Sequence, residues 1–166
     1  NADDSRWLMR PVLPTRSLIR PDDDSLSQAA DILNTGERVT ILGGAGCAGS
    51  HGALMEIAGR LNAPIVHAMR GKEYIEYDNP FDVGMTGLLG FTSGYKAIKE
   101  ADTLLMLGTD FPYKNFYPTG KTVVQLDLRG GHVGRRTSVD HALVGDAQQT
   151  LQTLVPLLEQ KTDDRH

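Results

Sequence analysis

The sequence has few of the residues that crosslink a chain or anchor it in a membrane. One cysteine, Cys47, stands among 166 residues, which excludes an internal disulfide and a zinc site of clustered thiolates. No stretch approaches the ~20 apolar residues that a membrane-spanning helix needs, and the polar start NADDSR predicts no signal peptide. The five histidines are scattered without metal-ligand spacing. We therefore expect a cytoplasmic protein with no metal site of its own.

The charge is also low, with a formal net charge of −4, so the chain has no general attraction to nucleic acid or anionic lipid. Hydrophobic residues make up 40% of it and charged residues 23%, as in ordinary globular proteins. A chain of this length buries roughly 70% of its unfolded surface and folds without crosslinks. Prolines and aspartates predict an extended linker over residues 1–24, followed by one domain over 25–160 and a polar tail over 161–166.

Nine segments have the pattern of regular secondary structure. Helices are predicted over residues 25–33, 50–61, about 94–101 and 147–158. Strands are predicted over residues 39–42, 64–67, 103–107, 122–126 and 142–144. Asp24 is expected to cap the first helix and Gly36 to end it, while Pro156 bends or stops the last one. Residues 70–93 are expected to be rich in loops.

The predicted strands are almost continuously apolar, so both faces of their sheet should be covered. Strands that alternate with helices indicate crossover connections and parallel pairing. The predicted fold is therefore α/β, a doubly wound, mainly parallel sheet in a Rossmann-like three-layer domain.

A glycine turn, Gly44-Ala45-Gly46-Cys47-Ala48-Gly49, follows the first predicted strand and precedes a helix, and it matches G-x-G-x-x-G. Gly44 and Gly46 either let the backbone approach a phosphate or only close a tight turn. Ordinary NAD binding is disfavoured because the second strand, at residues 64–67, ends without the carboxylate that holds the ribose. Arg70 and Lys72 are suited to a 2′-phosphate, but nothing else supports NADP.

Ligands of open α/β sheets bind beyond the carboxyl ends of the strands. Asp127 follows the fourth predicted strand with no clear helix after it, so a ligand role is favoured there. Asp146 follows the fifth strand and is either a ligand contact or the cap of the closing helix. The glycine-rich loop at residues 84–90 is either a surface for a flat ring or pyrophosphate, or a flexible lid. Aromatic side chains gather at residues 111–117, as in a packed loop or a subunit interface.

Several longer segments carry a more specific resemblance. They lie at residues 63–73, 76–80, 83–90, 108–113, 116–119 and 142–146. Together they resemble the central domain of pyruvate oxidases, and most of all the bacterial quinone-dependent pyruvate dehydrogenases. The likeness covers nearly the whole chain beyond the linker.

The resemblance implies that this domain holds FAD across the strand ends. The positions that match the family's flavin contacts are Thr86, Gly87, Leu88, Leu89, Thr109, Asp110, Phe111, Pro112, Tyr113 and Asp127. It also implies a parent enzyme that converts pyruvate to acetate and CO2 on thiamine diphosphate and Mg²⁺ and passes electrons through FAD to a quinone. Such a parent is a homo-oligomer with flanking thiamine-binding domains, peripheral at the inner membrane face. No residue of this chain is expected to be catalytic.

One departure from the family concerns the turn after Asp127. The family usually continues with one variable residue, then Asp or Asn, and then Pro, whereas this chain continues Leu128-Arg129-Gly130-Gly131, which predicts a looser loop near the adenine. An alternative interpretation is a central domain that braces its neighbours, or holds another adenine nucleotide, in a non-oxidative thiamine-dependent decarboxylase or lyase.

Overall fold

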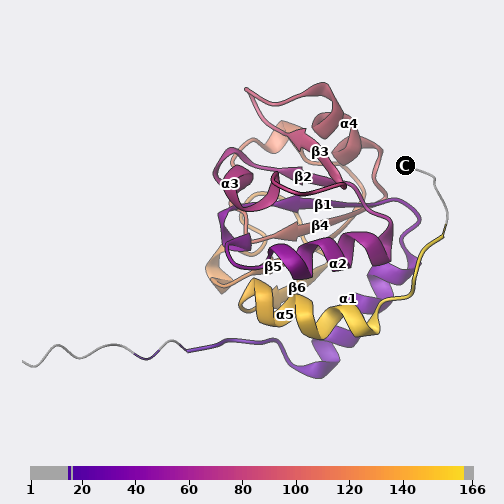
Figure 1. Cartoon of the computed structure of the whole chain (residues 1–166), viewed down its shortest axis with the longest axis vertical. Coiled ribbons are helices and arrows are strands. Elements are labelled where there is room, and N and C mark those ends of the chain that lie inside the picture. The colour runs from indigo at the N-terminus through magenta and orange to yellow at the C-terminus, as the bar shows by residue number, and fades with distance from the viewer. Residues whose placement is uncertain (1–14, 16, 163–166) are drawn as a thin grey trace, which may run out of the picture.

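The computed structural model describes residue 15 and residues 17–162, and its centre is a six-stranded sheet (Figure 1). The strands are β1 (Val39–Gly43), β2 (Ile65–His67), β3 (Asp82–Met85), β4 (Thr103–Leu107), β5 (Thr122–Asp127) and β6 (His141–Val144). They lie in the order β3-β2-β1-β4-β5-β6, and every neighbouring pair is parallel. The predicted doubly wound α/β fold is confirmed.

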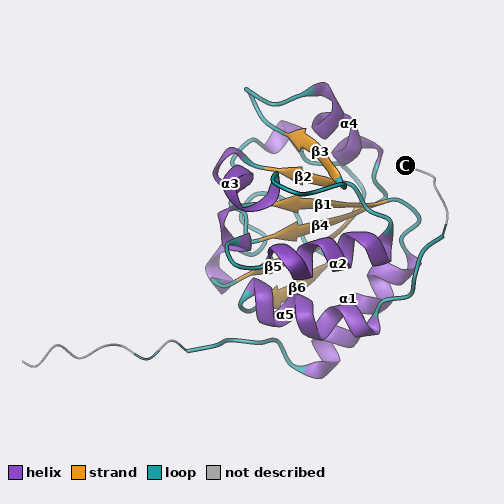
Figure 2. Ribbon diagram, in the orientation of Figure 1, coloured by secondary structure: helices purple, strands orange, loops and turns teal. Residues whose placement is uncertain are grey.

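The helices are α1 (Asp23–Thr35), α2 (His51–Leu61), α3 (Lys72–Ile75), α4 (Thr92–Glu100) and α5 (Ala147–Leu154). Helices α1, α2 and α5 lie together on one face of the sheet (Figure 2). Side chains alternate along each strand, so Ile41 packs toward these helices while its neighbour Leu42 packs toward the other face. That second face is covered by Ile98 of α4 and by the loop residues Phe111 and Tyr117. Both faces are covered, as the apolar strands predicted.

Residues 70–93 contain more regular structure than expected. They include the short helix α3 and the edge strand β3. The sequence of β3, Asp82-Val83-Gly84-Met85, lacks a continuous apolar run because an edge strand that is only partly buried does not need one. No helix in residues 17–162 is long and apolar enough to cross a membrane.

The helix ends also differ from those predicted. Helix α1 begins at Asp23, and its cap is Asp22, whose side chain accepts a hydrogen bond from the Ser25 amide; Asp24 lies inside the helix. Gly36 ends α1 as expected. The α-helical part of α5 stops at Leu154, and a 3-10 turn that contains Pro156 follows.

The last residues of the expected linker pack against the domain. Pro21 is buried, and the carbonyl of Ile19 accepts a hydrogen bond from the Asp146 amide at 2.7 Å. Residues 1–14 and 163–166, which hold most of the linker and the polar tail, lie outside the described residues. The division of the chain into linker, domain and tail stays a prediction.

The two central strands, β1 and β4, come unusually close just beyond their carboxyl ends. A Cβ atom on Gly46 would lie 2.6 Å from the Cα atom of Gly108, and one on Gly108 would lie 2.5 Å from the Cα atom of Gly46. Gly108 also has a φ of +52°, which side-chain-bearing residues rarely adopt. Only glycine fits both positions without moving the backbone.

We expect Gly108→Ala to lower the free energy of unfolding by about 2 kcal/mol or more, because the new methyl group meets backbone atoms and φ is positive. Gly52→Ala is the matched control, since nothing lies within 4 Å of its added Cβ in helix α2. That variant should unfold at the same urea concentration or a higher one. Equal urea midpoints for the two variants would contradict the close-approach argument.

We also expect Asp22→Ala to lower the urea midpoint and Asp24→Ala to change it much less, because only Asp22 caps α1. The hydrogen bond from the Ser25 amide holds the pKa of Asp22 below its usual value. The stabilisation is therefore present at neutral pH and is lost as the pH falls through the lowered folded pKa. Urea unfolding at pH 7 and in acid should show that the difference in urea midpoint between wild type and Asp22→Ala becomes smaller in acid. A difference that stays constant would refute a role for the ionised cap.

Candidate functional site

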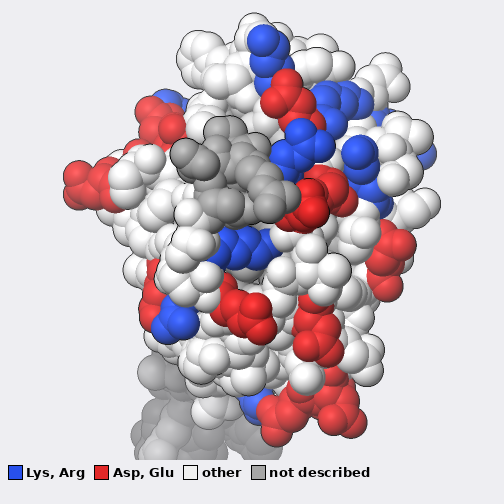
Figure 3. Space-filling model, turned by 90° about the vertical axis from the view of Figure 1, so that its right-hand side faces the viewer, with Lys and Arg blue, Asp and Glu red and all other residues white. Residues whose placement is uncertain are grey.

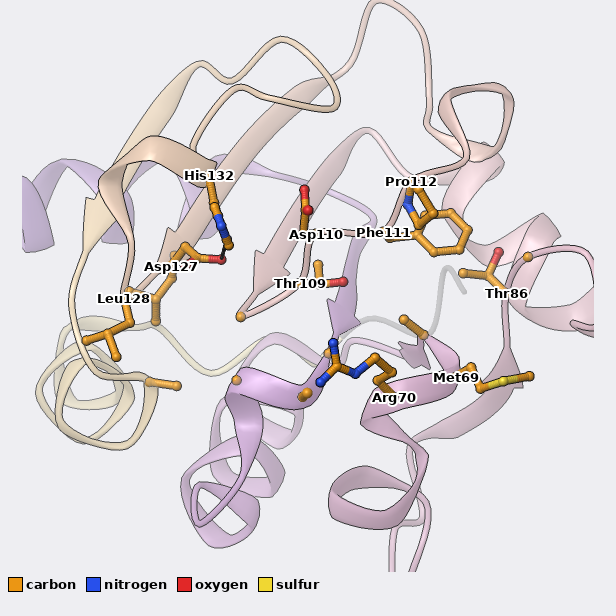
Figure 4. A pocket seen from close by; sticks show the side chains of 18 of the residues that line it. Met69, Arg70, Thr86, Thr109, Asp110, Phe111, Pro112, Asp127, Leu128 and His132 are labelled. Atoms are coloured by element: carbon orange, nitrogen blue, oxygen red, sulfur yellow. Dashed lines mark ion pairs between the residues drawn. The ribbon is translucent and has the colours of Figure 1, made fainter.

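A cavity of about 660 Å³ lies at the carboxyl ends of the strands (Figure 4). All six strands contribute to it through the turns that follow them, at residues 44–46, 68–70, 85–89, 108–113, 126–132 and 145–147. This is the position at which open parallel sheets bind ligands. Its volume lies within the roughly 300–1,000 Å³ of small-molecule and cofactor sites.

Every site residue predicted from the sequence lines this one cavity. These residues are Gly44, Gly46, Thr86, Gly87, Leu88, Leu89, Thr109, Asp110, Phe111, Pro112, Tyr113, Asp127 and Asp146. They come from five different turns, which the sheet topology brings together. Their contact with a cofactor stays a prediction.

The glycine turn after β1 uses its amides within the protein. The Gly44 amide donates to the carbonyl of Leu107 at 3.0 Å, and the Gly46 amide donates to that of Gly108 at 2.9 Å. The residues between β1 and α2 form a 3-10 turn rather than an open phosphate loop. Of the two interpretations of this motif, the tight turn accounts for the observed geometry.

The loop after β3 is held at both ends. The Thr86 amide donates to the carbonyl of His67 at 3.0 Å, and the Phe91 amide donates to that of Met85 at 2.8 Å. Between them, Leu88 and Leu89 are 72% and 71% exposed. Hydrogen bonds thus hold both ends of this loop, and two apolar side chains between them lie exposed at the cavity rim.

Thr86 carries an unusual polar atom. Its side chain is 3% exposed, and its Oγ1 atom has no hydrogen-bond partner. A buried hydroxyl without a partner costs free energy. Because this oxygen is also closed to solvent, a ligand in the cavity would reach it only after a small shift of the loop after β3. Figure 4 places this side chain on the cavity wall beside Phe111.

Aromatic rings form the wall beside Thr86. Phe111 makes edge-to-face contacts with Tyr113, Phe116 and Tyr117, with ring centroids 5.3 to 5.9 Å apart. The Tyr117 hydroxyl donates to the carbonyl of Phe111 at 2.7 Å, and burial raises the pKa of that hydroxyl. The packed loop expected from the sequence is present, and it stiffens the turn after β4.

Asp110 is committed to a partner that the sequence analysis missed. Arg136 donates to both of its carboxylate oxygens, from Nε at 2.6 Å and from Nη2 at 2.8 Å. These hydrogen bonds hold the pKa of Asp110 below its usual value. In Figure 4 the Asp110 carboxylate points away from Arg70. Its side chain therefore braces the loop after β4 rather than facing the centre of the cavity.

Asp127, at the end of β5, is 7% exposed. Its Oδ1 atom accepts a hydrogen bond from the Arg129 amide at 2.8 Å, and its Oδ2 atom lies 3.6 Å from Nδ1 of His132 (Figure 4). A 3-10 turn, Gly130–His132, follows, and Gln125 bonds its side chain to both His132 and Gly134. These bonds hold the turn after Asp127, where the sequence analysis expected a looser loop; the looseness itself stays a prediction.

Asp146 is the cap of α5. Its side chain accepts a hydrogen bond from the Gln149 amide at 3.3 Å while it also lines the cavity. The cap interpretation is therefore confirmed for this residue, and a ligand contact stays a prediction.

Other residues that line the cavity were given no cofactor role by the sequence analysis or only a doubtful one, and they include Met69, Arg70 and His132. Arg70 is exposed, and its guanidinium points into the cavity toward Thr109 (Figure 4). A lone arginine in a loop gives no sequence signal of this kind. Its position depends on the 3-10 turn Met69–Gly71, which the sequence pattern does not reveal.

Among the described residues, no group of three or more His, Cys, Asp or Glu side chains is placed to hold a metal ion. Burial raises the pKa of the Cys47 thiol to about 12, so it is not a nucleophile near neutral pH. His67 is buried beside Glu76 and Asp82, at 3.4 and 3.5 Å, and does not itself line the cavity. The residues that line the cavity are suited to binding and orienting a ligand.

The comparisons with known proteins agree with this picture. The chain is 51% identical over 146 residues to an uncharacterised 42.6 kDa protein from the isoamylase 3′ region of Pseudomonas amyloderamosa, covering 88% of this chain and 37% of that protein. It is 33% identical over 147 residues to YdaP of Bacillus subtilis, named as a thiamine pyrophosphate-containing protein, covering 89% and 26%. The chain thus spans well under half the length of these relatives.

A solved structure from Mycobacterium smegmatis, described as a thiamin diphosphate-dependent enzyme, superposes with a TM-score of 0.77 at 23% identity. It covers 94% of this chain, which amounts to 31% of that one, and it shows the shared fold. Residues 26–154 match the family model described as the central domain of thiamine pyrophosphate enzymes. This chain therefore belongs to the family of thiamine pyrophosphate enzyme central domains.

Proposed function

We propose that this chain is the FAD-binding central domain of a thiamine-diphosphate-dependent oxidoreductase that acts on pyruvate. The parent enzyme would convert pyruvate to acetate and CO2 and pass electrons to a quinone, as the sequence resemblance implies. FAD supplies a two-electron acceptor when bound, and this chain's own residues bind and orient it. The thiamine diphosphate, its Mg²⁺ and the catalytic groups would belong to flanking domains of a homo-oligomeric parent.

The observation that carries the proposal is the buried hydroxyl of Thr86. It lacks a hydrogen-bond partner in the described chain and lies in the cavity wall beside Phe111. The flanking side chains of Leu88, Leu89 and Tyr113 make this end of the cavity apolar. An aromatic ring with polar edge atoms, such as an isoalloxazine, satisfies both requirements: its faces pack on apolar groups and its edge accepts from a hydroxyl.

The opposite end of the cavity is polar. Asp127 and His132 lie there, beside the exposed cation of Arg129. A carboxylate at a strand end accepts hydrogen bonds from ribose hydroxyls. Arg70 points into the space between the two ends (Figure 4), where a guanidinium is suited to a pyrophosphate. An apolar end, a central cation and a polar end fit an extended dinucleotide.

A second candidate is a smaller adenine nucleotide held only at the polar end. It is favoured by the exposure of Leu88 and Leu89, which leaves the apolar end of the cavity open on this chain. In that case the domain braces its neighbours in a non-oxidative thiamine-dependent decarboxylase or lyase. The two candidates differ in whether the apolar end takes part in binding.

Titration of the purified chain with FAD and with ADP distinguishes them. We expect FAD to bind more tightly than ADP, with a perturbed flavin absorption spectrum, because the isoalloxazine adds contacts at the apolar end. Equal affinities for FAD and ADP would favour the smaller nucleotide, and no binding of either would count against both. Pyruvate and thiamine diphosphate should give no turnover with this chain alone, because the proposal assigns the thiamine-binding and catalytic groups to the flanking domains.

For Asp127→Asn we expect FAD affinity to fall about tenfold or more, because a charged acceptor for ribose hydroxyls is lost while the bond from the Arg129 amide can be kept. The comparison variant Asp146→Ala should lose about 1 kcal/mol of stability as a missing helix cap, with little effect on FAD affinity. Calorimetric titration measures the affinities and urea unfolding the stabilities. Equal losses of FAD affinity would remove the distinction between the two carboxylates.

For Thr86→Val we expect the ligand-free chain to be as stable as wild type or more stable, because the substitution removes a buried hydroxyl without a partner. FAD affinity should nevertheless fall several-fold. Thr150→Val is the matched control, since Thr150 in α5 is also buried with no partner for its hydroxyl but does not line the cavity. A stability loss for Thr86→Val with unchanged FAD affinity would disprove the role given to this hydroxyl.

A further inference from the structure

A second cavity, of about 480 Å³, lies between the loop that leads into β5 and the loop that leads into β6. We shall call it the basic pocket, because four of its lining side chains are the cations Lys114, Lys121, Arg135 and Arg136. None of its lining residues is an aspartate or glutamate. This concentration of cations runs against the chain's net charge of −4, so the average surface composition does not explain it.

One of these cations is fixed in place. Arg136 bonds Asp110 through Nε and Nη2, at 2.6 and 2.8 Å, and its pKa is raised by those bonds. The bidentate contact holds the guanidinium plane still while the residue lines the basic pocket. Arg135 approaches the same carboxylate at 3.5 Å. A single carboxylate thus faces two guanidinium groups, and positive charge remains in excess.

The rest of the wall offers hydrogen-bond donors. Thr119, Thr137 and Ser138 contribute hydroxyl groups, and the glycines at 120 and 134 leave room between the loops. The nearby carboxylate of Asp140 is already engaged, because it accepts a hydrogen bond from the Val123 amide at 2.8 Å. Arginine, lysine and hydroxyl donors around a concave space are the combination that recognises phosphate oxygens.

We propose that the basic pocket binds a phosphate dianion, either inorganic phosphate or the phosphate group of a small monoester. It is separate from the cofactor cavity, with which it shares no lining residue. A guanidinium already anchored by Asp110 loses little conformational freedom when the anion binds, which favours affinity. The assignment does not depend on the proposed binding of FAD.

A small ligand is favoured over a polyanion. Nucleic acids need an extended basic surface, whereas these cations surround one concavity. On the face of the molecule that Figure 3 shows, basic side chains are interspersed with acidic ones, and acidic ones predominate toward the bottom. That face offers no continuous basic track, and the overall negative charge opposes a polyanion as well.

The test is a titration of the ¹⁵N-labelled chain with sodium phosphate at constant ionic strength, with sodium chloride as the reference salt. We expect saturable shifts of the Gly120, Gly134, Thr137 and Ser138 amides with phosphate and none with chloride. In the double variant Lys114→Ala/Lys121→Ala, phosphate affinity should fall about tenfold or more, because two charged donors are lost. Arg135 and Arg136 are left intact because both contact Asp110, which lines the cofactor cavity.

Lys96→Ala is the control. Lys96 is an exposed cation on α4 that does not line the basic pocket, so its loss should leave phosphate affinity unchanged. A dispersed spectrum confirms that each variant is folded. Equal shifts with chloride and phosphate would overturn the proposal, and so would equal phosphate affinity in wild type and the double variant. Saturable shifts with an oligoglutamate peptide and none with phosphate would also overturn it, in favour of an acidic protein segment.

A second arm with glycerol phosphate separates the two sources of the dianion. Tighter binding than inorganic phosphate supports a monoester ligand, and weaker binding supports inorganic phosphate. FAD titrations of the double variant keep the proposals apart. Wild-type FAD affinity together with reduced phosphate affinity supports an independent anion site, whereas parallel loss of both overturns that independence.

Discussion

The structure depends on how closely the chain passes itself beyond β1 and β4. Two glycines, Gly46 and Gly108, lie so close that neither can carry a side chain, and the Gly46 amide donates to the Gly108 carbonyl. This contact fixes the ends of the two central strands, on either side of which the strand order diverges. Because the turns after β2 and β3 lie on one side and those after β5 and β6 on the other, the cavity is open along the whole sheet edge.

The fold could be predicted from the sequence better than the roles of individual residues. Five of the six strands follow from short apolar runs. Four of them are buried parallel strands, which require such runs, and the fifth is the edge strand β6, in which only Leu143 is buried. The strand that was missed, β3, is a half-buried edge strand with a glycine in it. The G-x-G-x-x-G turn indicated a phosphate site or a tight turn. In the structure, Gly46 has no room for a side chain because Gly108, 62 residues later in the chain, lies against it.

The same holds within the site: the location of its residues could be predicted, but their side-chain partners could not. The rule that ligands bind at strand ends indicated Asp127 and Asp146, and the family resemblance indicated residues 86–89 and 109–113. The structure brings all of these residues to one cavity. The partners of those residues were not predictable. Arg136 bonds Asp110 across 26 residues of chain, and His132 approaches Asp127 through a 3-10 turn with no sequence signature. Side-chain pairing is set by loop conformation, which short-range pattern does not determine.

These pairings change the electrostatic character of the cavity. The three aspartates expected to receive a ligand each accept hydrogen bonds from the protein: Asp110 from Arg136, Asp127 from the Arg129 amide and Asp146 from the Gln149 amide. Their negative charge is therefore partly compensated before any ligand arrives. Within the described part of the chain, the guanidinium of Arg70 makes no hydrogen bond or ion pair with another residue, and it points into the cavity. A cavity whose carboxylates are engaged and whose central cation is available suits a ligand with negative charge in its middle, as a dinucleotide has at its pyrophosphate.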